Sequence, residues 1–172
     1  LVHGSRPQID AILEREGIES SFQDGYRITS ERAMRFVAQA VGEKRMGIEA
    51  KLSTDMEASP MRGAKVRVIS GNFIIARPRG VVNGTDFAYS GEVRKVDTSG
   101  IRHALGNRNL VLISHIGYSR TGEMFNLACE AVACEVATAL NADKLIVFSR
   151  ARGLMQQNEL VRYTTPHDCI EQ

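Results

Sequence analysis

Two stretches of the sequence follow the same order of apolar strand, glycine turn and helix. Near the start, Leu1 and Val2 have the character of a buried strand, Gly4 follows, and a helical pattern begins near Ser5. Further along, residues 110–113 form a continuous apolar run, glycine turns follow, and apolar side chains recur at helical spacing up to about residue 140. Continuous apolar runs are typical of strands that are covered on both faces. This alternation predicts an α/β fold with a mostly parallel sheet between two layers of helices.

Other elements are predicted from their boundary residues and their periodicity. Ser5 is a predicted N-cap of the first helix, Thr29 or Ser30 caps a long helix that runs to about Leu52, and Asp97 caps a short one. A further helix is expected from Asn126 to residue 140. The other predictions are strands at residues 66–68, 73–75, 92–96 and 145–148, a loop at residues 53–62 and an edge strand at residues 160–163.

Composition narrows the class of protein. A length of 172 residues suits one domain. The net charge of +2 gives no basis for a nucleic-acid partner, and no apolar run approaches the ~18 residues that span a membrane. The three cysteines are an odd number in a chain of this size, which favours buried thiols over disulfides, and no cluster of cysteines and histidines indicates a metal site. We therefore expect a protein that is not secreted and binds neither metal, membrane nor nucleic acid.

Two glycine-containing segments in the first thirty residues are candidates for a ligand site. Gly4 and Ser5 lie where a strand meets a helix N-terminus, which can bind an anion through backbone N–H groups. A tight turn with a cap is the more common explanation of that pattern. Arg27 lies between turn residues just before a helix and could clamp a carboxylate, although such an arginine is more often a solvated surface charge.

A third candidate segment follows the strand at residues 110–113. Asn126 and Glu130 lie at the start of the next predicted helix, and open α/β sheets bind ligands beyond the carboxyl ends of their strands. The structural alternatives are an N-cap for Asn126 and a water-exposed helix carboxylate for Glu130. These patterns by themselves leave the choice open.

Longer motifs point to a family. Residues 1–9 (LVHGSRPQI), 25–29 (GYRIT) and 122–126 (GEMFN), in this order, resemble the acetylglutamate branch of the amino-acid kinase superfamily. Residues 68–73 (VISGNF), 80–87 (GVVNGTDF) and 90–97 (SGEVRKVD) are similar to the N-acetylglutamate synthase family. The resemblance implies a three-layer αβα sandwich of the amino-acid kinase fold.

The resemblance also implies a role. Residues 1–172 are expected to be an incomplete amino-acid kinase-like domain without its first strand and its C-terminal part, and the GNAT acetyltransferase domain of the family lies outside this chain. The parent enzyme would transfer acetyl from acetyl-CoA to L-glutamate in arginine biosynthesis, in the cytoplasm of a bacterium or the stroma of a plastid. This region would be a non-catalytic regulatory and oligomerisation domain without a cofactor of its own. L-arginine would be the allosteric effector of the parent, which would form a homo-oligomer.

The resemblance further implies a vestigial, kinase-like pocket for L-glutamate or N-acetylglutamate. Its expected residues are Gly4, Ser5, Arg6, Arg27, Asn126 and Glu130. The kinases hold phosphate with a loop that is richer in glycine, and they carry a second asparagine, an aspartate in place of Glu130 and another aspartate where residues 150–153 read RARG. Phosphoryl transfer depends on positioning and charge neutralisation, so we expect this chain not to phosphorylate acetylglutamate.

Two alternatives to a synthase region remain open at this point. The chain could be a working acetylglutamate kinase, or a stand-alone sensor module that binds an amino acid. If it is a synthase region, the resemblance implies that this chain alone binds arginine weakly or not at all. As a surface residue, Arg27 should tolerate replacement by alanine at a cost within about 0.5 kcal/mol.

Overall fold

A three-stranded parallel sheet forms the centre of the computed structural model, which describes residues 1–54, 63, 66–149, 153, 155–156 and 159–163. Its strands, in spatial order, are β1 (Val2–His3), β9 (Leu110–Ser114) and β4 (Val68–Ser70). β1 and β4 both pair in parallel with β9, the most apolar run of the sequence, whose three central residues are buried. The predicted parallel character of the central sheet is therefore confirmed.

A second sheet has four strands and is mixed. Its order is β11 (Met124–Asn126), β10 (Ile116–Tyr118), β5 (Ile74–Pro78) and β8 (Gly91–Val96). Two of them, β5 and β10, directly follow β4 and β9 of the first sheet in the sequence. β10 runs parallel to β5, and the β11–β10 and β5–β8 pairs are antiparallel. The remaining strands form two-residue hairpins: β2 (Phe22–Gln23) with β3 (Tyr26–Arg27), β6 (Val81–Val82) with β7 (Thr85–Asp86), and β12 (Met155–Gln156) with β13 (Glu159–Leu160).

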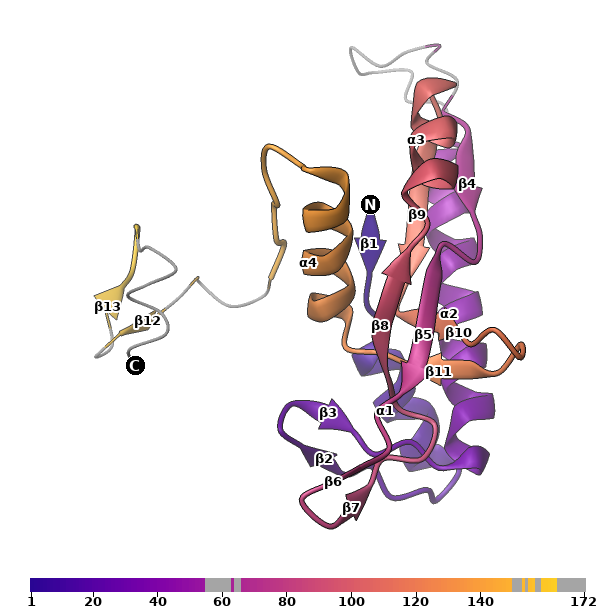
Figure 1. Cartoon of the computed structure of the whole chain (residues 1–172), viewed down its shortest axis with the longest axis vertical. Helices are drawn as coiled ribbons and strands as arrows, with labels where there is room; N and C mark the ends of the chain where they lie inside the picture. The colour runs from indigo at the N-terminus through magenta and orange to yellow at the C-terminus, as the bar shows by residue number, and fades with distance from the viewer. Residues whose placement is uncertain (55–62, 64–65, 150–152, 154, 157–158, 164–172) are drawn as a thin grey trace.

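Helices cover the strands from two sides (Figure 1). They are α1 (Arg6–Arg15), α2 (Glu31–Leu52), α3 (Thr98–Gly106) and α4 (Cys129–Leu140). One apolar core joins α1 and α2 to Ile116 of β10, and a separate core joins α3 and α4 to β5, β8 and β9. Two cores on opposite sides of the strands give the three layers of an αβα sandwich, as predicted. None of the helices in the described part of the chain is both long and apolar enough to cross a membrane.

Helix ends mostly follow their local signals. Ser30 begins α2, and its side chain accepts a hydrogen bond from the backbone N–H of Ala33 at 3.2 Å. Asp97 caps α3 in the same way through Gly100 at 3.0 Å. Ser5 is the N-cap residue of α1, as predicted, but its side chain makes no capping hydrogen bond. Ser5 is also one of the residues that line the pocket described below.

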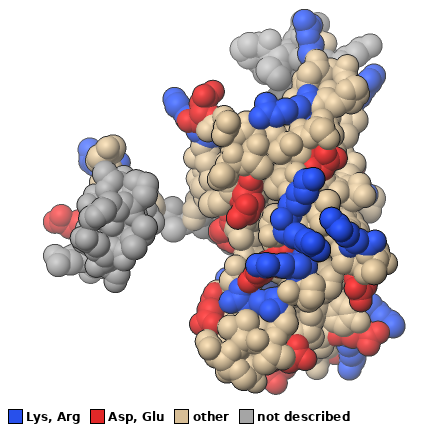
Figure 2. Space-filling model, in the orientation of Figure 1, with Lys and Arg blue, Asp and Glu red and all other residues tan. Residues whose placement is uncertain are grey.

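Basic side chains gather over β5 and β8 on the face that Figure 2 shows, with acidic side chains close to them. Arg77 and Arg79 share one carboxylate: they contact Glu92 of β8 at 2.9 and 2.8 Å. The charge of these two arginines is therefore partly neutralised within the protein.

Four predicted elements differ from the observed ones. The strand predicted at residues 66–68 shares only Val68 with β4. Residues 145–148 were expected to form a buried strand, but they form no strand and Phe148 is 91% exposed. An apolar run favours burial, but it becomes a strand only beside a backbone with free hydrogen-bonding groups, and this run pairs with no described strand. The helix expected from Asn126 begins at Cys129, because Asn126 ends β11. Of the edge strand expected at residues 160–163, Leu160 alone is in a strand.

Some predictions fall partly or wholly outside the described residues. Residues 55–62 of the predicted loop belong to this group, as do residues 150–152 of the altered kinase motif and Cys169. Cys129 and Cys134 are free thiols, as predicted, but Cys129 is only half-buried and Cys134 is exposed, so the prediction of a buried thiol is wrong for Cys134.

Gly117 gives a test of core packing. A Cβ atom at Gly117 would lie 2.6 Å from Cβ of Ala76 and 2.8 Å from Cδ1 of Leu127. We expect Gly117→Ala to lower the free energy of unfolding by about 1–3 kcal/mol through overpacking. The matched control is Gly47→Ala in α2, where a Cβ meets nothing within 4 Å. The control should raise the free energy of unfolding by about 0.5–1 kcal/mol. If urea denaturation shows that both variants gain stability, or that both lose it, this account is contradicted.

Candidate functional site

A pocket of about 650 Å³ opens at the carboxyl ends of β1 and β9. All six residues that the resemblance assigned to a ligand site line it: Gly4, Ser5, Arg6, Arg27, Asn126 and Glu130. The pocket is bounded by the start of α1, the β2–β3 hairpin, α4 along its whole length and residues 144–148. Because the carboxyl ends of parallel strands meet at one edge of a sheet, residues more than a hundred positions apart come together here.

The loop between β1 and α1 forms one wall of the pocket. Gly4 packs closely on the start of α4, since a Cβ atom at this position would lie 3.4 Å from Sγ of Cys129. Ser5 is fully buried, and its hydroxyl has no hydrogen-bond partner among the described residues. Backbone N–H groups in the first turn of a helix have no intrahelical acceptors and form the positive end of its dipole. This wall can therefore accept a negatively charged group.

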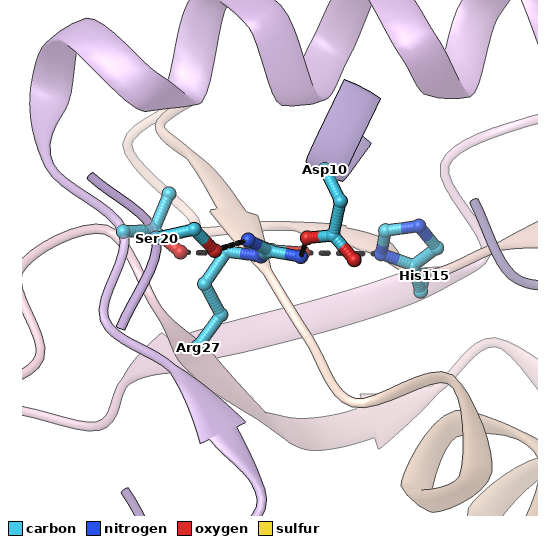
Figure 3. A network of polar contacts seen from close by, with 6 residues as sticks. Asp10, Ser20, Arg27 and His115 are labelled. Carbon is cyan, nitrogen blue, oxygen red and sulfur yellow. Dashed lines mark hydrogen bonds and ion pairs between the residues drawn. The ribbon is translucent and has the colours of Figure 1, made fainter. Parts of the chain in front are cut away.

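Arg27 is buried and bonded within the protein (Figure 3). Its guanidinium contacts the Asp10 carboxylate at 2.6 Å and donates to the hydroxyl of Ser20. Its side chain is 5% exposed, whereas that of Asp10 is 46% exposed. The alternative of a solvated surface charge at Arg27 is therefore wrong, because the β2–β3 hairpin folds this residue onto α1.

Asn126 belongs to a chain of buried hydrogen bonds rather than to a helix cap. Its Nδ2 donates to Oγ1 of Thr29 at 3.0 Å, so its Oδ1 is the acceptor that faces Nδ1 of His115 at 3.1 Å. Nδ1 of His115 therefore carries the proton. Oγ1 of Thr29 lies 2.9 Å from Oγ of Ser90, and Ser90 donates to the backbone carbonyl of Arg27. This network connects β11 to the hairpin strand that carries Arg27.

Burial sets the protonation of the ionisable groups in and beside the pocket. It lowers the pKa of His115 to about 4, against a partly compensating hydrogen bond with Asn126, so the imidazole is neutral at pH 7. Burial also lowers the pKa of His3. Burial and the nearby Glu130 carboxylate raise the pKa of the Cys129 thiol to about 11. Cys129 is therefore a protonated thiol at pH 7 and a poor nucleophile.

Arg6 and Glu130 are exposed charges on the pocket wall. Arg6 begins α1, and its guanidinium lies 4.2 Å from the centre of the Phe22 ring. Glu130 lies in the first turn of α4 and faces water, as its structural alternative predicted. No group of three or more potential metal ligands occurs among the residues that the structure describes.

Sequence reasoning missed four residues that shape the site. They are Asp10, Phe22, Thr29 and His115, of which Thr29 was considered as a helix cap. Each is an ordinary residue in its local context: a helix aspartate, a hairpin aromatic, a residue before a helix and a residue after a strand. A signal exists for His115 alone, since it directly follows the buried strand that begins at Leu110, at the strand end where sheets of this class bind ligands.

Comparison with known proteins decides the family. The Amino acid kinase family matches residues 1–168. The chain belongs to the amino acid kinase family. Its fold agrees with that membership.

Relatives within the amino acid kinase family are more specific. The amino-acid acetyltransferase of Pseudomonas fluorescens (strain SBW25) is 52% identical over 167 residues, which are 96% of this chain and 39% of that protein. N-acetylglutamate synthase from Neisseria gonorrhoeae, complexed with coenzyme A and L-arginine, superimposes with a TM-score of 0.85 at 34% identity, over 92% of this chain and 37% of that one. The same enzyme with coenzyme A and N-acetyl-glutamate gives a TM-score of 0.83 at 33% identity, over 94% of this chain and 36% of that one. The chain thus spans about 39% of the length of the curated relative that it matches.

Proposed function

We propose that this chain is the amino-acid kinase-like region of an N-acetylglutamate synthase. The complete enzyme would transfer the acetyl group of acetyl-CoA to the amine of L-glutamate, in the cytoplasm of a bacterium. The observation that carries the proposal is the 52% identity to an amino-acid acetyltransferase over 96% of the chain. The solved relatives with coenzyme A and L-arginine or N-acetyl-glutamate support the same substrate class.

Within that enzyme we propose that this region regulates and oligomerises rather than catalyses. The pocket supports this proposal because the two residues expected to grip a kinase substrate, Arg27 and Asn126, are already hydrogen-bonded inside the protein. The acidic residue of the pocket, Glu130, replaces the aspartate of the kinases and is exposed on α4. What remains is a pocket with a cationic wall that could retain a carboxylate ligand of the glutamate class without reacting with it.

A coupled assay for ADP release separates a regulatory region from a kinase. With ATP, Mg²⁺ and N-acetylglutamate, the chain should release ADP no faster than the buffer. The complete protein encoded by the same reading frame should release free coenzyme A from acetyl-CoA in the presence of L-glutamate. Robust ADP release by this chain, or an absence of acetyl transfer by the complete protein, would contradict the proposal.

The proposal also predicts how the chain responds to L-arginine. The family resemblance implies that the effector pocket draws on segments outside residues 1–172. Isothermal titration calorimetry should therefore show weak or absent binding of L-arginine to this chain. The complete protein should bind the same ligand measurably, and tight binding to the chain alone would show that the effector pocket lies within it.

A further inference from the structure

One aromatic ring on the pocket wall holds two guanidinium groups. The guanidinium carbon of Arg6 lies 4.2 Å from the centre of the Phe22 ring, and that of Arg27 lies 4.5 Å from it. All three residues line the pocket. Cations are attracted to the faces of aromatic rings, so Phe22 holds both arginines in place at the pocket wall.

The two arginines differ in whether their charge is already neutralised. Arg27 is buried and ion-paired with Asp10 at 2.6 Å. Arg6 is exposed and makes no ion pair within the described part of the chain. An anion that enters the pocket therefore meets an uncompensated charge at Arg6 and a compensated one at Arg27.

The surroundings of Arg6 also favour an anion. Arg6 begins a ten-residue helix, so its guanidinium lies at the positive end of the α1 dipole. The preceding residue, Ser5, contributes a fully buried hydroxyl without a partner among the described residues. The charged residues that line the pocket are Arg6, Arg27 and Lys144 against Glu130. The balance of these side chains is positive.

We propose that Arg6, and not Arg27, binds the carboxylate of the ligand in this pocket. Phe22 is the platform that orders the Arg6 guanidinium before the ligand arrives, which reduces the entropy lost on binding. The planar guanidinium can then form two parallel hydrogen bonds with a carboxylate. Arg27 has a structural role instead, because its ion pair with Asp10 fixes the β2–β3 hairpin, and with it Phe22, against α1. This inference rests on the proposed function, which supplies N-acetylglutamate as the ligand class.

Calorimetric titration of the 172-residue chain with N-acetylglutamate tests this assignment. Arg6→Ala should weaken binding about tenfold or more, because a charge-assisted bidentate contact is lost. Arg6→Lys should fall between this variant and the wild type, since it keeps the charge and loses the planar fork. The matched control is Arg15→Ala, which removes the same charge from the exposed C-terminal end of α1 and should leave affinity unchanged.

The outcomes separate this inference from the proposed function. If the wild-type chain and Arg6→Ala bind N-acetylglutamate equally well, the assignment of Arg6 is wrong and the pocket proposal stands. If the wild-type chain binds no N-acetylglutamate, the ligand pocket and the assignment both fail, while the acetyl-transfer proposal stands or falls by its own assay. Competition by inorganic phosphate that depends on Arg6 at equal concentrations would overturn the carboxylate assignment in favour of a phosphate site. Circular dichroism of each variant checks that the helices are intact.

Discussion

Asp10→Asn is expected to lower the free energy of unfolding by about 2–4 kcal/mol. The substitution preserves the shape of the side chain and removes the negative charge that neutralises Arg27 at 2.6 Å. Arg27 keeps its positive charge in a site where its side chain is 5% exposed, and an uncompensated buried charge is costly. Because Asp10 is half-exposed, we expect a smaller loss of stability than the largest losses seen when a fully buried ion pair is broken. Urea denaturation at neutral pH measures the loss.

The reverse substitution provides the comparison that identifies the cause. Arg27→Met leaves Asp10 charged, but that carboxylate is 46% exposed and can be hydrated. We expect a smaller loss of about 1–2 kcal/mol, from the contacts with Ser20 and Phe22. The loss of within about 0.5 kcal/mol expected for Arg27→Ala assumed a surface arginine, and that assumption fails because Arg27 is buried. If Arg27→Met loses as much stability as Asp10→Asn, or more, the uncompensated buried charge of Arg27 is not the main cause of the loss in Asp10→Asn.

Acidification should destabilise the protein through His115. Its pKa falls from an ordinary 6.5 to about 4 in the folded chain, so the unfolded chain binds the proton more readily. The stability that the folded chain gains from a neutral His115 is fully present above pH 6.5. It declines as the pH falls toward 4 and is lost below pH 4. The size of the shift corresponds to a loss of about 3 kcal/mol across this window. Thermal or urea denaturation at several pH values between about 7.5 and 4 measures it.

His115→Asn isolates this contribution from those of other titrating groups. The asparagine amide can still donate to Oδ1 of Asn126, the acceptor that His115 uses, but it does not titrate. The variant should lose less stability than the wild type between pH 6.5 and pH 4. Parallel pH profiles for the two proteins would mean that His115 is not the group responsible. His3, whose pKa burial also lowers, would then be the next residue to replace.

Ligand-site residues were predictable where a family motif carried them. Gly4, Arg27 and Asn126 were assigned from short ordered motifs, and the fold brings them to one pocket. Their bonding could not be predicted, because it depends on partners distant in the chain. Thr29 and Asn126 are 97 residues apart, and Asp10 and Arg27 are 17 apart on different elements. No local pattern distinguishes an arginine that grips a ligand from one paired with a helix aspartate.

The sequence by itself determined the α/β class, a helix cap at Thr29 or Ser30, another at Asp97, and the buried strand at residues 110–113. These features depend on side chains within a few positions of each other, so periodicity and capping chemistry predict them. The tertiary structure alone decided that residues 145–148 form no strand, and that Arg27 is neutralised while Arg6 has no ion-pair partner among the described residues. The physical reason is the same in each case: a strand requires a neighbouring backbone, and the charge that a site offers depends on the counter-charge that folding places beside it.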